Sequence, residues 1–144
     1  MEFIIRKAVA DDAQQISDLI EDSMGFYNPP EVIKTNLERI LPLSTDMVLV
    51  AVYNGEIIGL AHAENYDTLY DLPMKDLMSL AVKTEYQNKK IGTKLMVAIE
   101  KWAIETGRKG IQVLSRTELV NAHKFYQSLG YEIEKQQLNF HKYF

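Results

Sequence analysis

Residues 80–95 read Leu-Ala-Val-Lys-Thr-Glu-Tyr-Gln-Asn-Lys-Lys-Ile-Gly-Thr-Lys-Leu, and this stretch decides the fold. An apolar run from Leu77 to Val82 ends at three polar residues, and an apolar spacing of three to four residues begins at Ile91. The pattern predicts a strand, a polar turn and the N-terminus of a helix. Backbone N–H groups at a helix N-terminus have no partner within the helix, and the helix dipole is positive there. We therefore expect the turn to hold an anion such as a phosphate, with its lysines adding positive charge.

A second segment, residues 121–131, reads Asn-Ala-His-Lys-Phe-Tyr-Gln-Ser-Leu-Gly-Tyr. Its apolar residues fall on one helical face, namely Ala122, Phe125, Tyr126 and Leu129. Gly130 is a natural left-handed stop for such a helix, and a strand is expected to start at Tyr131.

Both segments resemble signatures of the GNAT N-acetyltransferases. The first signature is a glutamine or arginine, two residues, a glycine, one residue, and a glycine or alanine. Gln87 and Gly92 fit it, whereas Lys90 stands at the first glycine position. A Lys90 side chain that points outward would leave its amide free and place an ammonium beside the phosphates. The second signature is a helix with alanine and then phenylalanine-tyrosine, closed by glycine and an aromatic residue, and the two segments follow the family's order and separation.

The resemblance implies that the turn binds the pyrophosphate of acetyl-CoA and that the preceding strand binds the pantetheine arm through its backbone. The implied cosubstrate-binding residues are Leu80, Ala81, Val82, Gln87, Asn88, Lys89, Lys90, Ile91, Gly92, Thr93 and Asn121. Helix capping or a surface amide would explain Asn121 equally well.

Two residues are the expected catalytic groups. Tyr126 matches the family's tyrosine and would protonate the leaving thiolate, although a core tyrosine packed on Phe125 is the simpler structural alternative. Asp76 lies near the start of the strand, where some family members keep a glutamate, and it would accept the amine proton through a water. A solvated aspartate is an equal alternative. Three further acids on the expected acceptor side would bind a cationic amine: Glu64, Asp67 and Asp71.

The three histidines, His62, His123 and His141, have no metal-ligand spacing, so no metal is expected and each has a structural or surface role as its simplest explanation. His62 lies on a predicted strand beside the expected cleft and could relay a proton.

Composition bounds these expectations. A chain of 144 residues with 47% apolar and 25% charged residues predicts a single domain over 1–144 with a proper core. The absence of cysteine excludes disulfides and thiolate chemistry. A net charge of −4 argues against a nucleic-acid partner and mildly favours a cationic substrate. No leader-like N-terminus and no apolar run of membrane-spanning length are found, which predicts a cytoplasmic protein without a membrane partner.

The remaining pattern predicts an α+β fold. Expected strands cover 4–8, 47–53, 56–65, 77–82 and 110–115, with the first two long ones joined by Asn54-Gly55. Apolar residues on both sides place 47–53 inside the sheet. Helices are expected after an Asp11 cap, over 31–41, from Ile91 to about Gly107, and over the second signature. The loops at 23–30 and 66–75 would shape the acceptor pocket. Residues 131–144 are expected to form one or two closing strands or to pair with a second copy in a homodimer. This order matches the GNAT fold, a mixed sheet of about six or seven strands with about four helices.

The leading hypothesis is an acetyl-CoA-dependent N-acetyltransferase that acts on a primary amine of a small molecule or peptide. The alternative is a non-catalytic acyl-CoA-binding module, motivated by Lys90 and by the open question of the base. A phosphate-binding or interaction domain without CoA is the least favoured, because it leaves the second signature unexplained.

Overall fold

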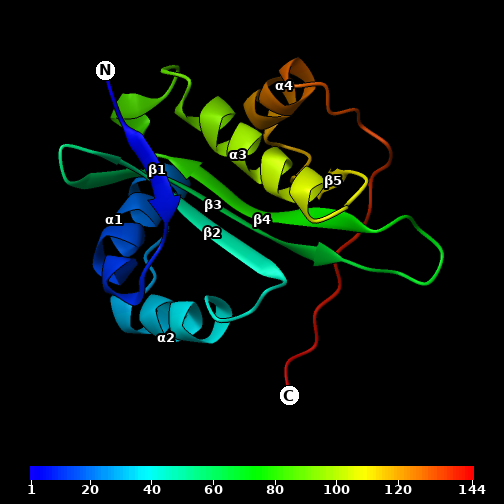
Figure 1. Ribbon diagram of the computed structural model, residues 1–144, viewed down its shortest axis with the longest axis horizontal. Helices are drawn as coiled ribbons and strands as arrows, with labels where there is room; N and C mark the ends of the chain where they lie inside the picture. The colour runs from blue at the N-terminus through cyan, green and yellow to red at the C-terminus, as the bar shows by residue number, and fades with distance from the viewer. The chain divides into compact units, whose positions relative to one another are not determined.

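A five-stranded mixed sheet organises residues 1–113 of the computed structural model, which describes residues 1–144 (Figure 1). Its strands are β1 (Ile4–Lys7), β2 (Asp46–Tyr53), β3 (Glu56–Tyr66), β4 (Met74–Val82) and β5 (Ile111–Val113), in the order β1-β2-β3-β4-β5. Neighbours pair antiparallel except β4 and β5, which are parallel. The mixed α+β sheet is confirmed, but with five strands rather than six or seven.

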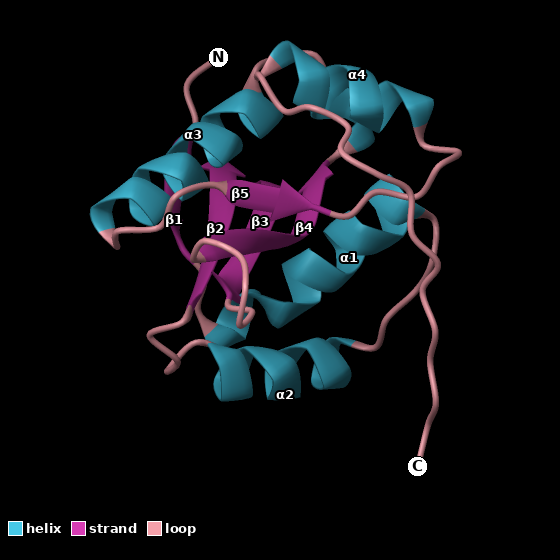
Figure 2. Cartoon of the chain, turned by 90° about the vertical axis from the view of Figure 1, so that its right-hand side faces the viewer, coloured by secondary structure: helices cyan, strands magenta, loops and turns pink.

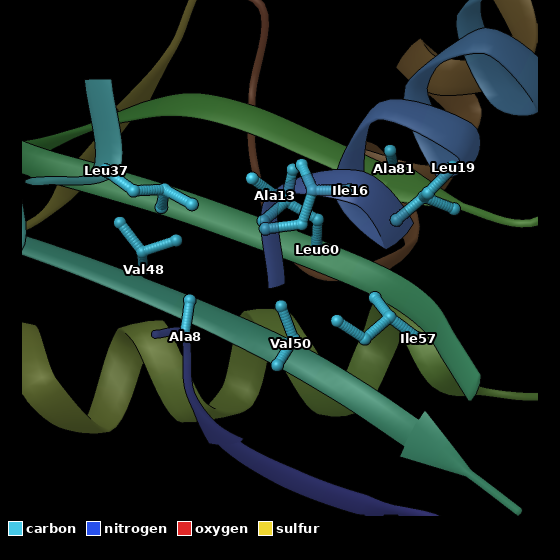
Figure 3. Close-up of a cluster of buried hydrophobic side chains, with 10 residues drawn as sticks. All are labelled: Ala8, Ala13, Ile16, Leu19, Leu37, Val48, Val50, Ile57, Leu60 and Ala81. Carbon is cyan, nitrogen blue, oxygen red and sulfur yellow. The ribbon is translucent and has the colours of Figure 1, made fainter. Parts of the chain in front are cut away.

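Helices cover both faces of this sheet (Figure 2). On one face lie α1 (Ala13–Met24) and α2 (Pro30–Ile40), whose buried side chains meet those of β2, β3 and β4 in one apolar cluster (Figure 3). Its central members are Ile16, Leu19, Val50 and Leu60, each at most 5% exposed. Full burial of one such side chain contributes about 1.5–3 kcal/mol, so this cluster fixes the helices on the sheet.

On the opposite face α3 (Ile91–Glu105) packs against β3. Gly59 of β3 allows the close approach, because a Cβ atom there would lie 3.0 Å from both Ile91 Cγ2 and Leu95 Cδ1. Ile91 and Leu95, in the first two turns of α3, thereby pack directly on β3. Asn54 and Gly55 both have positive φ and form the expected hairpin turn, which places β2 between β1 and β3 as predicted.

The expected Asp11 cap is wrong. A 3-10 turn (η1, Ala10–Asp12) precedes α1, and Asp12 is the side chain that accepts the Val9 N–H, at 2.8 Å. Arg6 holds Asp12 through two hydrogen bonds of 2.8 and 2.9 Å. The ion pair with the neighbouring strand therefore selects Asp12 over Asp11, which the local sequence pattern does not reveal.

Two strand boundaries also differ from expectation. β4 begins at Met74 instead of Leu77, and β5 covers only 111–113 instead of 110–115. The polar residues Lys75 and Asp76 obscured the start of β4, because each is stabilised by tertiary contacts described below.

Residues 114–144 form a second compact unit, which we describe by itself, and the single domain expected over 1–144 stays a prediction. This unit contains α4 (Val120–Ser128), closed by Gly130 with φ of 95°, as predicted. Four α-helices are thus present. The expected closing strands in 131–144 are wrong: residues 132–144 form no backbone hydrogen bonds, and the apolar side chains of Leu138, Phe140 and Phe144 are exposed. Alternating apolar residues form a strand only where another strand pairs with them, and no strand pairs with residues 131–144.

Candidate active site

The turn between β4 and α3 presents a row of free backbone N–H groups. After Val82 the chain makes a short 3-10 turn (η2, Thr84–Tyr86) and then enters α3. The amides of residues 88–93 donate no hydrogen bond within the chain, and the first to do so is Lys94, which donates to Lys90 at 3.0 Å. Six consecutive free donors at the positive end of a 15-residue helix form an anion-binding surface.

Two residues of this turn adopt the left-handed region. Asn88 has φ of 62°, and Lys90, the N-terminal cap of α3, has φ of 70°. The family signature has glycine at the Lys90 position, and the positive φ is the physical reason that glycine suits it. The Lys90 side chain is exposed and leaves the Lys90 amide available, as predicted.

Contacts on both sides hold the turn in place. Asp22, near the end of α1, accepts the Thr84 N–H at 2.7 Å, and Gln87 Nε2 donates to the Val82 carbonyl at 3.3 Å. Lys83 donates to Glu56 in an ion pair. Lys83 is therefore committed to Glu56, and the lysines left exposed in this region are Lys89, Lys90 and Lys94.

β4 departs from its neighbour β5 just before this turn. The two strands pair only over Lys75–Leu77 and Ile111–Val113. At that point the register against β3 shifts, from Ala63–Leu77 to His62–Ser79, so that Met78 is an extra residue. Residues 78–82 consequently pair with β3 on one side and with no strand on the other. This edge includes Leu80, Ala81 and Val82 and offers backbone groups to an extended ligand.

Acidic residues gather on the sheet face that carries α1 and α2. Asp46, Glu64 and Asp76 are consecutive cross-strand partners on β2, β3 and β4, and Gln112 of β5 follows Asp76. Burial raises the pKa of the Asp76 carboxyl, the nearby Glu64 raises it further, and a hydrogen bond with Gln112 opposes both. A half-buried carboxylate with a raised pKa is a stronger base than an ordinary aspartate.

The other two acids expected on the acceptor side do not join this row. Asp67 pairs with Arg108, and Asp71 is exposed in the loop before β4. No group of three or more His, Asp or Glu side chains is arranged to hold a metal ion. No helix is long and apolar enough to cross a bilayer.

Sequence reasoning missed Lys75, which is 1% exposed on the α3 face of β4. Its Nζ donates to Asn65 Oδ1 at 2.6 Å and lies 3.4 Å from the centroid of the Trp102 ring. Burial lowers the pKa of Lys75. A lysine placed one residue before Asp76 gave no sequence signal for burial, because its amide and aromatic partners come from β3 and α3.

Tyr126 and Asn121 belong to the second unit. Asn121 is exposed in the first turn of α4, whose N-terminal cap is Leu119, so capping does not explain it. Tyr126 is half-buried and makes edge-on ring contacts with Phe125 and Tyr131. Burial raises the pKa of the Tyr126 phenol, which keeps it protonated and able to donate at neutral pH.

Comparison with known proteins finds relatives of this chain and solved structures with the same fold. An uncharacterised N-acetyltransferase of Chlorobaculum tepidum is 31% identical over 92% of this chain and 77% of its own length. Among solved structures, a transcriptional regulator from Bacillus halodurans superposes with a TM-score of 0.87 at 21% identity, covering 98% of this chain and 100% of its own. The aminoglycoside N-acetyltransferase AAC(6')-Iy, in complex with a CoA-containing bisubstrate analogue, has a TM-score of 0.86 at 19% identity, with 99% of both chains covered.

Residues 44–133 match the family model described as an acetyltransferase (GNAT) domain. This segment contains the turn, the β4 edge and the helix of the second signature. The chain therefore belongs to the GNAT acetyltransferase family.

Proposed function

We propose that this protein transfers the acetyl group of acetyl-CoA to a primary amine of a small molecule or peptide. The observation that carries the proposal is the run of six free amides, at residues 88–93, directly after the unpaired β4 edge. In acetyl-CoA an extended arm joins the thioester to a pyrophosphate. Its binding site therefore needs a strand-like edge for the arm and a group of N–H donors for the phosphates.

The amides of residues 88–93 would hold the pyrophosphate, with Lys89 and Lys90 adding charge at its rim. Leu80, Ala81 and Val82 would hold the arm by main-chain hydrogen bonds, and an N–H of this segment would donate to the thioester oxygen. Gln87 would fix the turn against Val82, the contact it makes in the structure.

Asp76 would remove a proton from the acceptor ammonium through a water, because an alkylammonium has a pKa of about 10.4 and is not nucleophilic. Tyr126 would donate its proton to the departing thiolate and regain one from the nitrogen of the new amide. Asn121 would bind the arm from α4. Glu64 would attract a cationic acceptor toward Asp76.

Ligand-dependent stabilisation tests the binding step. CoA and acetyl-CoA should raise the melting temperature, whereas ATP and NAD should not, because a ligand that binds only the native state adds about 2.7 kcal/mol at a hundred times its Kd. Gly92→Glu adds bulk and negative charge beside the free amides and should abolish the shift. Val97→Glu adds the same charge at an exposed position of α3 and should retain it. Equal shifts in both variants would contradict the phosphate site.

A panel of amines incubated with acetyl-CoA, with free thiol as the readout, tests the transfer step. Amine-dependent thiol release supports the enzyme. CoA binding without release by any amine would support the alternative, a non-catalytic acyl-CoA-binding module.

A further inference from the structure

His62 stands one position along the sheet from the Asp46–Glu64–Asp76 row. Its cross-strand partners are Val48 on β2 and Ser79 on β4. Val48 belongs to the apolar cluster under α1 and α2, so His62 faces the same side as Asp76. Directly opposed residues have Cβ atoms about 4.5–5.5 Å apart, which puts the imidazole beside Ser79. Ser79 follows the extra residue Met78, where β4 leaves β5 and the edge proposed for the thioester arm begins.

Asp46 fixes the imidazole of His62. The His62 Nε2 atom lies 2.8 Å from Asp46 Oδ2, and the two side chains are 17% and 6% exposed. The other oxygen of Asp46 accepts a hydrogen bond of 2.7 Å from the Thr45 hydroxyl, which orients the carboxylate. Because an ionised carboxylate can only accept, Nε2 carries the proton of this contact and Nδ1 retains its lone pair. Nδ1 makes no hydrogen bond within the chain.

We propose that His62 is a second proton-accepting residue of the transfer site and that Asp46 is its positioning residue. The inference rests on the proposed function. The acceptor R–NH₃⁺ gives one proton, directly or through Asp76, to Nδ1 of His62, and Asp46 stabilises the resulting imidazolium. The neutral nitrogen then bonds to the carbonyl carbon as the carbon–sulfur bond breaks. The second nitrogen proton replaces the one that Tyr126 gives to the thiolate, and His62 returns its proton to solvent.

The charges that face His62 are acidic. They come from Asp46 on β2, Glu64 on β3 and Asp76 on β4, while the side chains that α1 and α2 bury do not titrate: Ala13, Ile16, Ser17, Leu19 and Leu37. Asp76 alone would have to release its proton before each turnover, and a neighbouring imidazole gives that proton a path out of the site.

Steady-state kinetics with an acceptor found in the amine panel tests the proposal. His62→Gln should lower kcat by about 10²-fold, the range expected when a general base is lost, with little change in the KM for acetyl-CoA. Asp46→Asn should lower kcat by about 10-fold, as expected for an orienting partner. The acidic limb of the kcat/KM profile should weaken in both variants. Added imidazole should restore activity to His62→Ala in proportion to its concentration, which a purely structural histidine would not allow.

His141→Gln, in the exposed tail, is the matched control and should behave as the wild type. Wild-type kcat and pH profile in His62→Gln, with no imidazole rescue of His62→Ala, would overturn the inference and leave the proposed function intact. If the His62 variants do not fold, an Asp46→Asn enzyme with unchanged kcat and pH profile would overturn it. A wild-type protein that binds acetyl-CoA but acetylates no amine would instead refute the proposed function, and this inference with it.

Discussion

Removal of the hydroxyl oxygen of Tyr126 tests whether this residue acts in catalysis or only in packing. Tyr126→Phe keeps the ring and its edge-on contacts with Phe125 and Tyr131. If the phenol is the proton donor, kcat should fall by about 10²-fold while fold and CoA affinity stay nearly unchanged. The loss should shrink with an acyl donor whose thiol is more acidic, because that thiolate needs its proton less. Steady-state kinetics with both donors measures this, and wild-type turnover in the mutant would exclude Tyr126 as the acid.

Lys90 has a positive φ, which glycine, the residue of the family signature at this position, adopts without strain. A non-glycine residue in the left-handed region is strained by about 1–2 kcal/mol, and glycine returns part of this as extra freedom of the unfolded chain. Lys90→Gly should therefore raise the free energy of unfolding by about 0.5–1 kcal/mol in urea titrations. Lys89 lies next to it without a positive φ, so Lys89→Gly should be neutral or destabilising. Equal effects in the two variants would show that Lys90 is not strained.

For single residues, the sequence predicted the place in the fold better than the burial of the side chain. Gln87, Lys90 and Asp76 occupy the turn and the strand that the pattern predicted. The burial of Lys75 and the ion pair of Lys83 were not predicted, since their partners Asn65 and Glu56 lie 10 and 27 residues earlier in the chain. Such partners are set by the register of β3 and β4, which no local spacing encodes.

The N-terminus of α3 is positioned by β3 as well as by its own sequence. Gly59→Val should push Ile91 and Leu95 away from the sheet, since a Cβ atom at Gly59 already lies 3.0 Å from each. We expect a loss of about 1–3 kcal/mol in stability and a weaker CoA affinity, because the free amides of the turn move with the helix. Urea unfolding and CoA titration measure the two effects.

Gly110→Ala is the control for this substitution, because its Cβ would meet only the flexible end of Met74, at 3.1 Å. It should cost little stability and leave CoA affinity unchanged. A Gly59→Val protein that binds CoA normally would mean that the turn does not depend on this contact. Gly59 itself lies in a run of apolar strand residues, where the sequence indicated burial but not the close approach of a helix from a distant segment.

For the whole molecule, the order of helices and strands up to Gly130 was predictable from the sequence. The structure of residues 131–144 was not. Apolar periodicity identified the four α-helices and all five strands, although it gave β4 and β5 other bounds than the structure has. The tail at 131–144 has the same alternation without a paired partner, so the pattern alone could not decide its state. The homodimer and the cytoplasmic location remain predictions, since one depends on a second copy of the chain and the other on the cell.

The pH dependence of stability gives a further test of the acidic row. The folded-state pKa of Asp76 is raised above its ordinary 3.8, so between these two values the folded protein binds more protons than the unfolded chain. Stability due to this group therefore falls as pH rises through that window, and ionised Asp76 destabilises the fold at pH 7. Asp76→Asn removes the charge and should raise the melting temperature at pH 7, with the gain disappearing below about pH 3.8.

The same substitution should lower kcat, because the carboxylate that destabilises the fold is also the group proposed to accept the proton of the acceptor ammonium. Circular dichroism melts at both pH values, paired with the thiol-release assay, measure the two effects on one sample. Asp71→Asn, which removes an exposed carboxylate outside the row, should change neither quantity. An Asp76→Asn protein that is less stable at pH 7 would mean that the carboxylate is held favourably by Gln112. Unchanged thiol release by Asp76→Asn would exclude Asp76 as a base and leave His62, held by Asp46, in that role.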